Sequence, residues 1–234
     1  MTALSFLQQI RQGLLDLLFP SRCVGCGRVG AWLCDPCRAA LKPVLPPICS
    51  LCGRPVAQPQ LCHRCQQTPP QIDGIRSVLY FEGALRAAIH ALKYRRARDL
   101  AGLLGGLMGD YWQDQPIPVD VIVPVPLHPA RERSRGYNQS ALLALGLAEA
   151  ADLPVRVDLL ARIRATAPQV DLGAEARREN VRGAFYCENG SATGLRVLLV
   201  DDVCTTGATL EACSQALRAG GASSVWALTL ARAL

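Results

Sequence analysis

The sequence predicts an α/β protein with a mostly parallel, doubly wound sheet, preceded by a small cysteine-rich module. Half of the 234 residues are hydrophobic (50%), so the chain can bury a sizeable core. Eight of its 11 cysteines form four Cys-x-x-Cys pairs before residue 70. Beyond residue 70, apolar strand-like runs alternate with helical stretches, which is typical of parallel strands joined by helices.

The composition divides the chain into three segments. Residues 1–20 are expected to form an amphipathic docking helix, residues 21–70 the cysteine module and residues 71–234 the α/β domain. Pro20 ends a run in which apolar residues recur every three or four positions: Leu4, Leu7, Ile10, Leu14 and Leu17. Attachment to a membrane surface is the alternative, but such a helix carries several basic residues and this one has only Arg11.

We expect no stable membrane insertion and a cytoplasmic location. No stretch reaches the roughly 18 uncharged apolar residues that a spanning helix needs. The start of the chain lacks the basic region and the small-residue cleavage site of a secretory signal. The net charge of +6 is poor evidence for a polyanionic partner, because residues 71–234 carry 18 basic and 17 acidic residues. Thiolate-bound zinc would bring the first 70 residues close to neutral.

The elements of the α/β domain follow from its hydrophobic runs. Strands are expected where short apolar runs occur, at Arg76–Phe81, Val119–Val125, Val155–Leu160, Ala184–Cys187, Leu195–Asp201 and Ser224–Leu230. Helices are expected over longer periodic stretches, at Ala84–Lys93, Leu100–Trp112, Ser140–Ala151 and Leu210–Ala219. A polar loop begins at Arg162, and Gly220 and Gly221 end the last helix with the usual left-handed stop.

The four cysteine pairs predict two structural zinc sites. The pairs are Cys23 and Cys26, Cys34 and Cys37, Cys49 and Cys52, and Cys62 and Cys65. A two-residue gap lets both sulfurs of a pair reach one ion, and two pairs complete a tetrahedral site of four thiolates. Gly27 and Gly53 follow two of the pairs, where a tight turn needs a permissive backbone.

The way in which these pairs combine is open at this point. Four pairs can close sequentially, first with second and third with fourth, or they can interleave, and we favour the sequential arrangement. An iron–sulfur cluster is the alternative to zinc. Disulfides are disfavoured in a chain that we expect in the cytosol.

A second motif starts where the apolar run Leu195–Asp201 ends. Asp201 and Asp202 precede a short loop of threonine and glycine and then a helix, in the order Thr205, Thr206, Gly207, Ala208 and Thr209. The amides of this loop and the helix N-terminus would form an anion cradle, to which the threonine hydroxyls could donate. Because the carboxylates cannot bind the same anion, we expect phosphate in the loop and the hydroxyls of a ribose on the aspartates.

Other acidic motifs fit this segment less well. A receiver domain needs a phospho-accepting aspartate tens of residues later, and no Asp follows Asp202. A nucleotide hydrolase would need a Gly-x-x-x-x-Gly-Lys-Ser/Thr loop, which the sequence does not contain. A purely structural turn is the remaining alternative.

Basic residues cluster at two further places. Arg131, Arg133 and Arg135 follow a strand end, where ligands of open α/β sheets bind, and arginine suits a diphosphate. We favour Arg135 with Gly136 as the binding pair, and a solvated charge run is the alternative. Residues 93–98 surround an aromatic ring with four cations and could meet DNA or a diphosphate, or could simply end a helix.

These motifs together resemble the ComF/GntX family of phosphoribosyltransferase-like proteins. The resemblance rests on the cysteine pairs, the Asp201–Thr209 loop, Leu92-Lys93-Tyr94, Val123–His128, Arg135–Gln139, Pro168-Gln169 and Arg178–Phe185. It implies a double zinc ribbon followed by a type I phosphoribosyltransferase-like fold that binds phosphoribosyl diphosphate (PRPP). It also implies that Arg135 and Gly136 belong to a pyrophosphate loop. The implied role is the handling of incoming DNA, in natural competence or in the use of DNA as a nutrient.

Two functions are compatible with this resemblance. The first is an enzyme that transfers a phosphoribosyl group from PRPP to an unidentified acceptor, with Asp201 and Asp202 as catalytic residues. Mg²⁺ would bridge the diphosphate and the ribose hydroxyls. The second is a non-catalytic adaptor that binds PRPP or single-stranded DNA and couples to DNA-uptake or recombination proteins through its zinc ribbon. The sequence shows no obvious base-recognition pocket, which keeps the second function open.

Overall fold

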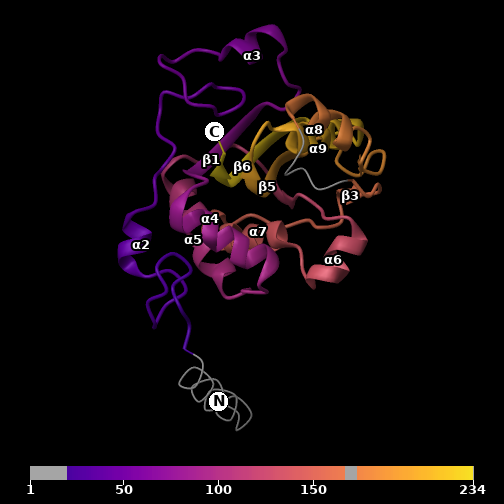
Figure 1. Ribbon diagram of the computed structural model, residues 1–234. Coiled ribbons are helices and arrows are strands. Elements are labelled where there is room, and N and C mark those ends of the chain that lie inside the picture. The colour runs from indigo at the N-terminus through magenta and orange to yellow at the C-terminus, as the bar shows by residue number, and fades with distance from the viewer. Residues whose placement is uncertain (1–19, 167–172, 234) are drawn as a thin grey trace.

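The computed structural model of the protein describes residues 20–166 and 173–233 (Figure 1). The docking helix expected over residues 1–20 lies outside these residues, apart from Pro20, and so does the Pro168-Gln169 motif.

A four-stranded parallel sheet forms the centre of the α/β domain (Figure 1). Its strands, in their order across the sheet, are β1 (Gly74–Tyr80), β6 (Ser224–Arg232), β5 (Arg196–Cys204) and β2 (Val121–Pro124). The middle of β5 is buried on both faces, which explains why its sequence reads as a continuous apolar run.

Helices cover both faces of this sheet. On one face, Leu198 and Val200 of β5 pack in a core with helices α4 (Gly83–Tyr94), α5 (Leu100–Asp114) and α7 (Gln139–Ala151). On the other face, Val197 and Leu199 pack in a second core with α8 (Ala174–Val181) and α9 (Ala208–Ala219). The alternation of neighbouring side chains between the two cores is the period of a strand. The predicted doubly wound α/β fold is therefore confirmed.

The strand predicted at Val155–Leu160 is wrong. Val155 makes a single parallel bridge to Ile122, and the chain then leaves the sheet. Val157 is 65% exposed and Arg156 pairs with Asp158 at 2.6 Å, so the polar residues of this segment hold it at the surface. The chain instead forms a small antiparallel pair of strands, β3 (Ala161–Arg162) and β4 (Phe185–Tyr186).

Arg131, Arg133 and Arg135, which follow the end of β2, lie on a helix rather than on a loop. Helix α6 (Pro129–Arg135) begins after His128, whose Nδ1 accepts a hydrogen bond from the Ala130 amide at 3.3 Å. A proline at the first helical position suits this start, because its missing N–H would have no partner there. Gly136 ends the helix with a φ of 86°, in the left-handed region that favours glycine.

The two halves of the cysteine module contact different parts of the α/β domain. The first half contains α2 (Asp35–Ala39), and its Val24 and Trp32 pack against the core under α4 and α5. The second half contains α3 (His63–Gln67) and runs beside β1, where the Ile75 amide donates to the Leu51 carbonyl at 2.8 Å. Figure 1 shows α2 beside α5, with α3 at the opposite end of the molecule.

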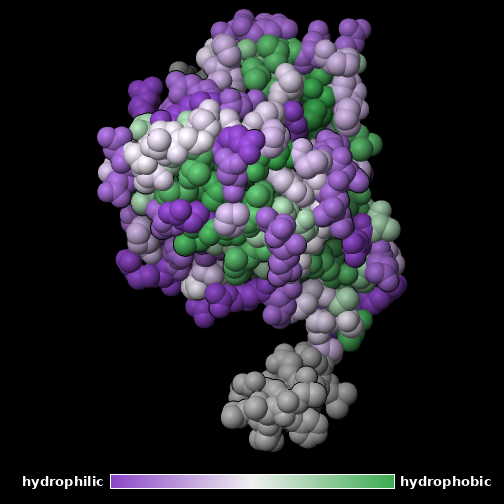
Figure 2. Space-filling view, turned by 180° about the vertical axis from the view of Figure 1, so that it is seen from behind, coloured by the Kyte–Doolittle hydropathy of each residue, from purple (hydrophilic) through white to green (hydrophobic). Residues whose placement is uncertain are grey.

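The surface of the molecule is mixed in character. Seen from behind, hydrophobic residues reach the surface in the middle and hydrophilic residues border them (Figure 2). Within residues 20–166 and 173–233, no helix has both the length and the hydrophobicity to cross a membrane.

The packing of α5 on α7 depends on two glycines that face each other. A Cβ on Gly105 would lie 2.8 Å from the Cα of Gly146, whereas a Cβ on Gly106 would meet nothing within 4 Å. We expect Gly105→Ala to lower the free energy of unfolding by about 1–3 kcal/mol through overpacking. The control Gly106→Ala should raise it by up to about 1 kcal/mol through helix propensity. Urea denaturation measures both, and equal shifts would contradict this packing.

Candidate functional site

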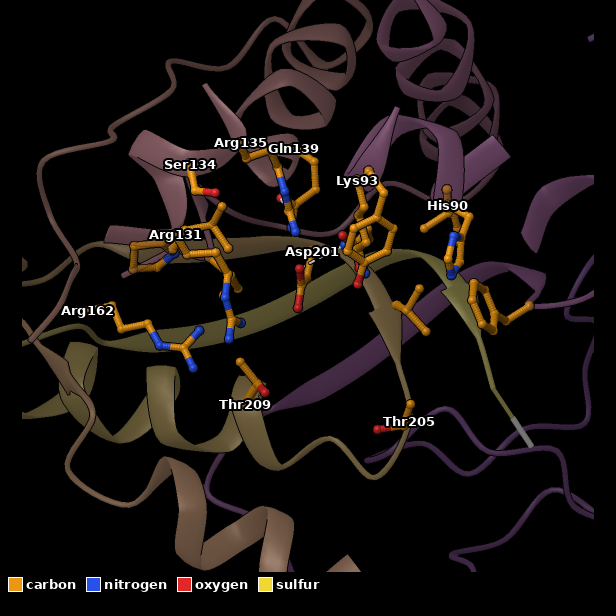
Figure 3. Close-up of a pocket in the computed structure, with 18 of the residues that line it drawn as sticks. His90, Lys93, Arg131, Ser134, Arg135, Gln139, Arg162, Asp201, Thr205 and Thr209 are labelled. Atoms are coloured by element: carbon orange, nitrogen blue, oxygen red, sulfur yellow. Dashed lines mark hydrogen bonds and ion pairs between the residues drawn. The ribbon is translucent and has the colours of Figure 1, made fainter. Parts of the chain in front are cut away.

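A pocket of about 670 Å³ opens at the carboxyl ends of the parallel strands (Figure 3). Phe81 follows β1, Val125 follows β2, and Thr205 follows β5. This edge is where open α/β sheets bind their ligands. Its cationic side chains are those of Arg86, Lys93, Arg96, Arg131, Arg135 and Arg162, and its carboxylates are those of Asp201 and Asp202.

The two aspartates lie inside β5, which continues to Cys204, three residues beyond the predicted strand end at Asp201. Asp202 is only 3% exposed, and its Oδ1 lies 2.6 Å from the Lys93 Nζ at the end of α4. Its other oxygen, Oδ2, has no hydrogen-bond partner among the described residues. The Asp201 Oδ1 accepts hydrogen bonds from the Ser140 hydroxyl at 2.8 Å and from the Asp202 amide at 2.9 Å. Both carboxylates line the pocket.

The pKa values of Asp201 and Lys93 are both shifted upward by their surroundings. Burial and the neighbouring Asp202 raise the pKa of Asp201 to about 7, against the opposing effects of Lys93 and Ser140. Burial by itself would lower the pKa of Lys93, but the Asp202 carboxylate outweighs it and the net shift is upward. Near neutral pH, Lys93 is therefore charged and Asp201 holds a proton for part of the time, which reduces the repulsion between the two carboxyl groups.

The loop between β5 and α9 is only three residues long. It consists of Thr205, Thr206 and Gly207, and α9 begins at Ala208. Gly207 has a φ of 80°, so its conformation needs a glycine, and as the N-cap residue it offers the first helical amides no side chain. This arrangement leaves a helix N-terminus at the mouth of the pocket, where an anion is favoured.

The predicted residues of this loop divide into two groups. Thr205 and Thr209 line the pocket with their side chains. The Thr206 hydroxyl oxygen instead accepts from the Ala208 amide at 3.4 Å, within the loop. Thr206, Gly207 and Ala208 can therefore meet a ligand through their backbone rather than through their side chains.

Two of the three arginines on α6 reach the pocket. Arg131 and Arg135 are four residues apart and share one face of the helix, and Arg133 lies outside the pocket. Arg135 also donates to the Gln139 Oε1. Gly136 ends the helix and does not line the pocket. Figure 3 shows Arg131 and Arg135 pointing toward Asp201.

The structure adds site residues that the sequence reasoning did not single out. Arg162 is only 9% exposed, its guanidinium lies 5.3 Å from the centre of the Phe185 ring, and its Nε has no partner among the described residues. His90 lies on α4, and its ring centre is 4.7 Å from that of Tyr94, which belongs to the cluster 93–98 predicted from the sequence. An arginine directly after an apolar run was the available signal for Arg162. His90 carried no such signal, because its position depends on the packing of α4.

The cysteines form two separate clusters in sequential pairing. The first cluster joins Cys23, Cys26, Cys34 and Cys37, and the second joins Cys49, Cys52, Cys62 and Cys65, with the sulfurs of each cluster within 4.8 Å of one another. The Cys26 and Cys34 sulfurs are 3.6 Å apart, as are those of Cys52 and Cys62. A Zn–S bond of ~2.3 Å in a tetrahedron gives a sulfur–sulfur distance of ~3.8 Å, so both clusters fit a zinc ion.

Comparison with known proteins identifies both domains. A family model described as a double zinc ribbon domain matches residues 14–66, and one described as a phosphoribosyl transferase domain matches residues 139–234. The DNA utilization protein YhgH of Salmonella typhi is 36% identical over 209 residues, which cover 86% of this chain and 91% of that protein. Competence protein F of Haemophilus influenzae is 32% identical over 209 residues, with coverage of 86% and 90%.

Solved structures give a distant similarity. The adenine phosphoribosyl transferase of Trypanosoma brucei has a TM-score of 0.41 and 13% sequence identity, and the match covers 67% of this chain and 83% of that one. The family models and the relatives confirm the double zinc ribbon and the phosphoribosyltransferase-like domain that the sequence predicts.

The cysteine clusters predict the metal content. Purified protein should contain about two zinc ions per chain, because eight thiolates make two four-ligand sites. Cys34→Ser should reduce this to about one, since three thiolates bind the ion less tightly, and should destabilise the first ribbon. Metal analysis of both proteins tests this, and a brown protein that contains iron and labile sulfide would contradict it.

The buried ion pair predicts a stability effect. Lys93→Met should lower the free energy of unfolding by about 2–3 kcal/mol, because it leaves the Asp202 carboxylate buried without a counter-charge. This is below the ~3–5 kcal/mol of a fully buried pair, since the Lys93 side chain is 22% exposed. The double variant Lys93→Met with Asp202→Asn should recover most of the loss. Urea denaturation of the wild type and of both variants measures these changes. A double variant as unstable as the single one would contradict the pairing of Lys93 with Asp202.

Proposed function

The chain belongs to the ComF/GntX family of phosphoribosyltransferase-like proteins, and we propose that it binds PRPP and transfers its phosphoribosyl group during the handling of internalised DNA. The names of its relatives, a DNA utilization protein and a competence protein, support a role in natural competence or in the use of DNA as a nutrient. We place this activity in the cytoplasm, where internalised DNA would be processed.

One observation carries this proposal above the others. The pocket sets two carboxylates at its centre among arginines and a lysine, and the Oδ2 of the buried Asp202 has no partner among the described residues. An unpaired buried polar atom costs free energy, and the hydroxyl of a ligand would supply the donor that Asp202 lacks. PRPP matches this pattern, since its ribose hydroxyls lie between two anionic groups.

Each part of the pocket has a counterpart in PRPP. The loop from Thr205 to Thr209 would take the 5-phosphate through backbone amides and threonine hydroxyls. Asp201 and Asp202 would accept hydrogen bonds from the ribose hydroxyls. Arg131, Arg135 and Arg162 would take the diphosphate, for which the flat guanidinium fork is well suited.

Mg²⁺ fits the same carboxylates. A hard divalent cation prefers carboxylate and phosphate oxygens and retains water, so Asp201 and Asp202 are the residues that would hold it. When bound, it would supply charge that stabilises the departing diphosphate.

The proposed reaction breaks the bond between C1 of the ribose and the diphosphate oxygen. The electron pair leaves with the diphosphate, which the arginines hold, and the acceptor's lone pair forms the new bond to C1. The ribose carries positive charge in the transition state, and the carboxyl groups of Asp201 and Asp202, which line the pocket, would stabilise that charge. The Lys93 Nζ lies 2.6 Å from the Asp202 Oδ1 and supplies its counter-charge.

The aromatic end of the pocket supports transfer over the adaptor function. Phe81, His90 and Tyr94 line it, and Tyr94 is 62% exposed. Flat aromatic rings suit an acceptor that contains a ring, such as a nucleobase, because rings stack on one another. The sequence alone shows no obvious base-recognition pocket. A turnover assay with PRPP against bases, nucleotides and single-stranded DNA separates the two functions, since an adaptor would bind without releasing diphosphate.

The proposal predicts a graded set of binding losses. Calorimetry should show Mg²⁺-dependent PRPP binding by the wild type and no binding by Gly207→Val. A β-branched residue is strained at a φ of 80°, and its Cβ would lie 3.1 Å from the Ile75 Cδ1, so the loop would have to shift. Asp202→Asn should weaken binding several-fold to about a hundredfold, in line with a charge-assisted hydrogen bond of roughly 1.5–3 kcal/mol. Thr206→Ala should be milder, because the loop amides remain.

A matched control comes from the other end of β5. Gly194 has a φ of 74° and precedes the start of the strand, so Gly194→Val introduces the same backbone strain away from the pocket. It should bind PRPP like the wild type. Absence of PRPP binding by the wild type, or normal binding by Gly207→Val, would refute the site.

A further inference from the structure

We propose that the second zinc ribbon positions the phosphate-binding loop, with Arg64 as the positioning residue. Arg64 lies on α3, between the ligands Cys62 and Cys65. Its Nη1 donates a hydrogen bond to the Thr206 carbonyl at 2.8 Å, across 142 residues of sequence. The inference rests on the proposed function, because Thr206 belongs to the loop that would bind the 5-phosphate.

A second arginine ties the same ribbon to the start of the loop. Arg232, at the end of β6, is 3% exposed, and its Nη1 donates to the Cys52 carbonyl at 2.6 Å. The same nitrogen lies 3.2 Å from the sulfur of Cys204, the last residue of β5. Both cysteine pairs of the second zinc site are therefore linked to the loop. Arg232 connects the first pair to Cys204, which precedes the loop, and Arg64 connects the second pair to Thr206 at its centre.

The bond from Arg64 sets the direction of a loop amide. The peptide unit between Thr206 and Gly207 is planar, so its carbonyl and its N–H point in opposite directions. Fixing the Thr206 carbonyl toward Arg64 therefore turns the Gly207 N–H away from the ribbon. A charge-assisted hydrogen bond is stronger than a neutral one, so it can hold this orientation in a loop of three residues. The cation also lies next to the loop and favours an anion there.

The first zinc ribbon provides an internal comparison. The position of Arg64 in its cysteine pair is taken by Pro36 in the first ribbon, and proline has no side-chain donor. Among the described residues, the first ribbon packs against α4 and α5, where a Cβ on Gly25 would lie 2.8 Å from the Ala84 Cβ. The two zinc sites should therefore have different effects on PRPP binding.

The test uses Arg64→Ala, with Arg54→Ala as the control. Arg54 belongs to the same ribbon and is exposed. The Arg64→Ala variant should keep two zinc ions and the unfolding midpoint of the wild type. It should bind PRPP about tenfold more weakly or worse, and without ligand its amides in residues 204–208 should exchange about tenfold faster. Arg64→Lys, which keeps a charged donor, should recover part of both effects, and Arg54→Ala should match the wild type.

A second pair of variants separates the two metal sites. Cys62→Ser and Cys34→Ser each remove one thiolate from one cluster, and only Cys62→Ser should weaken PRPP binding and speed exchange in the loop. Normal loop exchange or normal PRPP affinity in Arg64→Ala overturns the inference. If the wild type itself does not bind PRPP, the proposed function fails, and the exchange measurement alone then decides the role of Arg64.

Discussion

The arrangement of this site depends on a carboxylate that the fold buries at the end of its central strand. Asp202 points to the helix-covered side of β5, where an uncompensated charge would be very costly. The last turn of α4 supplies Lys93 as the counter-charge. The neighbouring carboxyl group, that of Asp201, accepts a hydrogen bond from Ser140 at the start of α7. Two helices and one strand are thus held in register by the requirement to stabilise one acidic pair.

The strand order then brings the remaining parts of the site together. β2 and β5 are neighbours in the sheet although more than 70 residues separate Pro124 from Cys204. The segments that follow them therefore meet at one edge, α6 with its arginines and the threonine loop with its helix N-terminus. Both supply positive potential, one from side chains and one from backbone amides, and the acidic pair lies between them. A ligand with anionic ends and a hydroxylated centre is the natural complement.

Much of this could be predicted from the sequence, because it is encoded locally. The strand Leu195–Asp201, the loop after it and the cysteine spacing each lie within a short window, and the structure agrees with them apart from a few residues at the boundaries. The strand at Val155–Leu160 failed because its residues do not alternate between a buried and an exposed face. Helix α6 was missed because its start depends on the His128 cap rather than on hydrophobic periodicity.

The contacts that tune the site could not be predicted, because they join segments that are distant in sequence. The pairing of Lys93 with Asp202 and the bond from Arg64 to Thr206 each cross more than 100 residues. The spacing of the cysteines indicates which residues bind zinc, but it does not indicate which part of the α/β domain the ribbon contacts. A small ribbon has little core of its own, so the metal fixes its shape. Where such a rigid unit donates hydrogen bonds to a three-residue loop, the metal's folding energy also limits the conformations of that loop. The second ribbon therefore contacts the loop from outside the pocket, and none of its described residues lines the pocket.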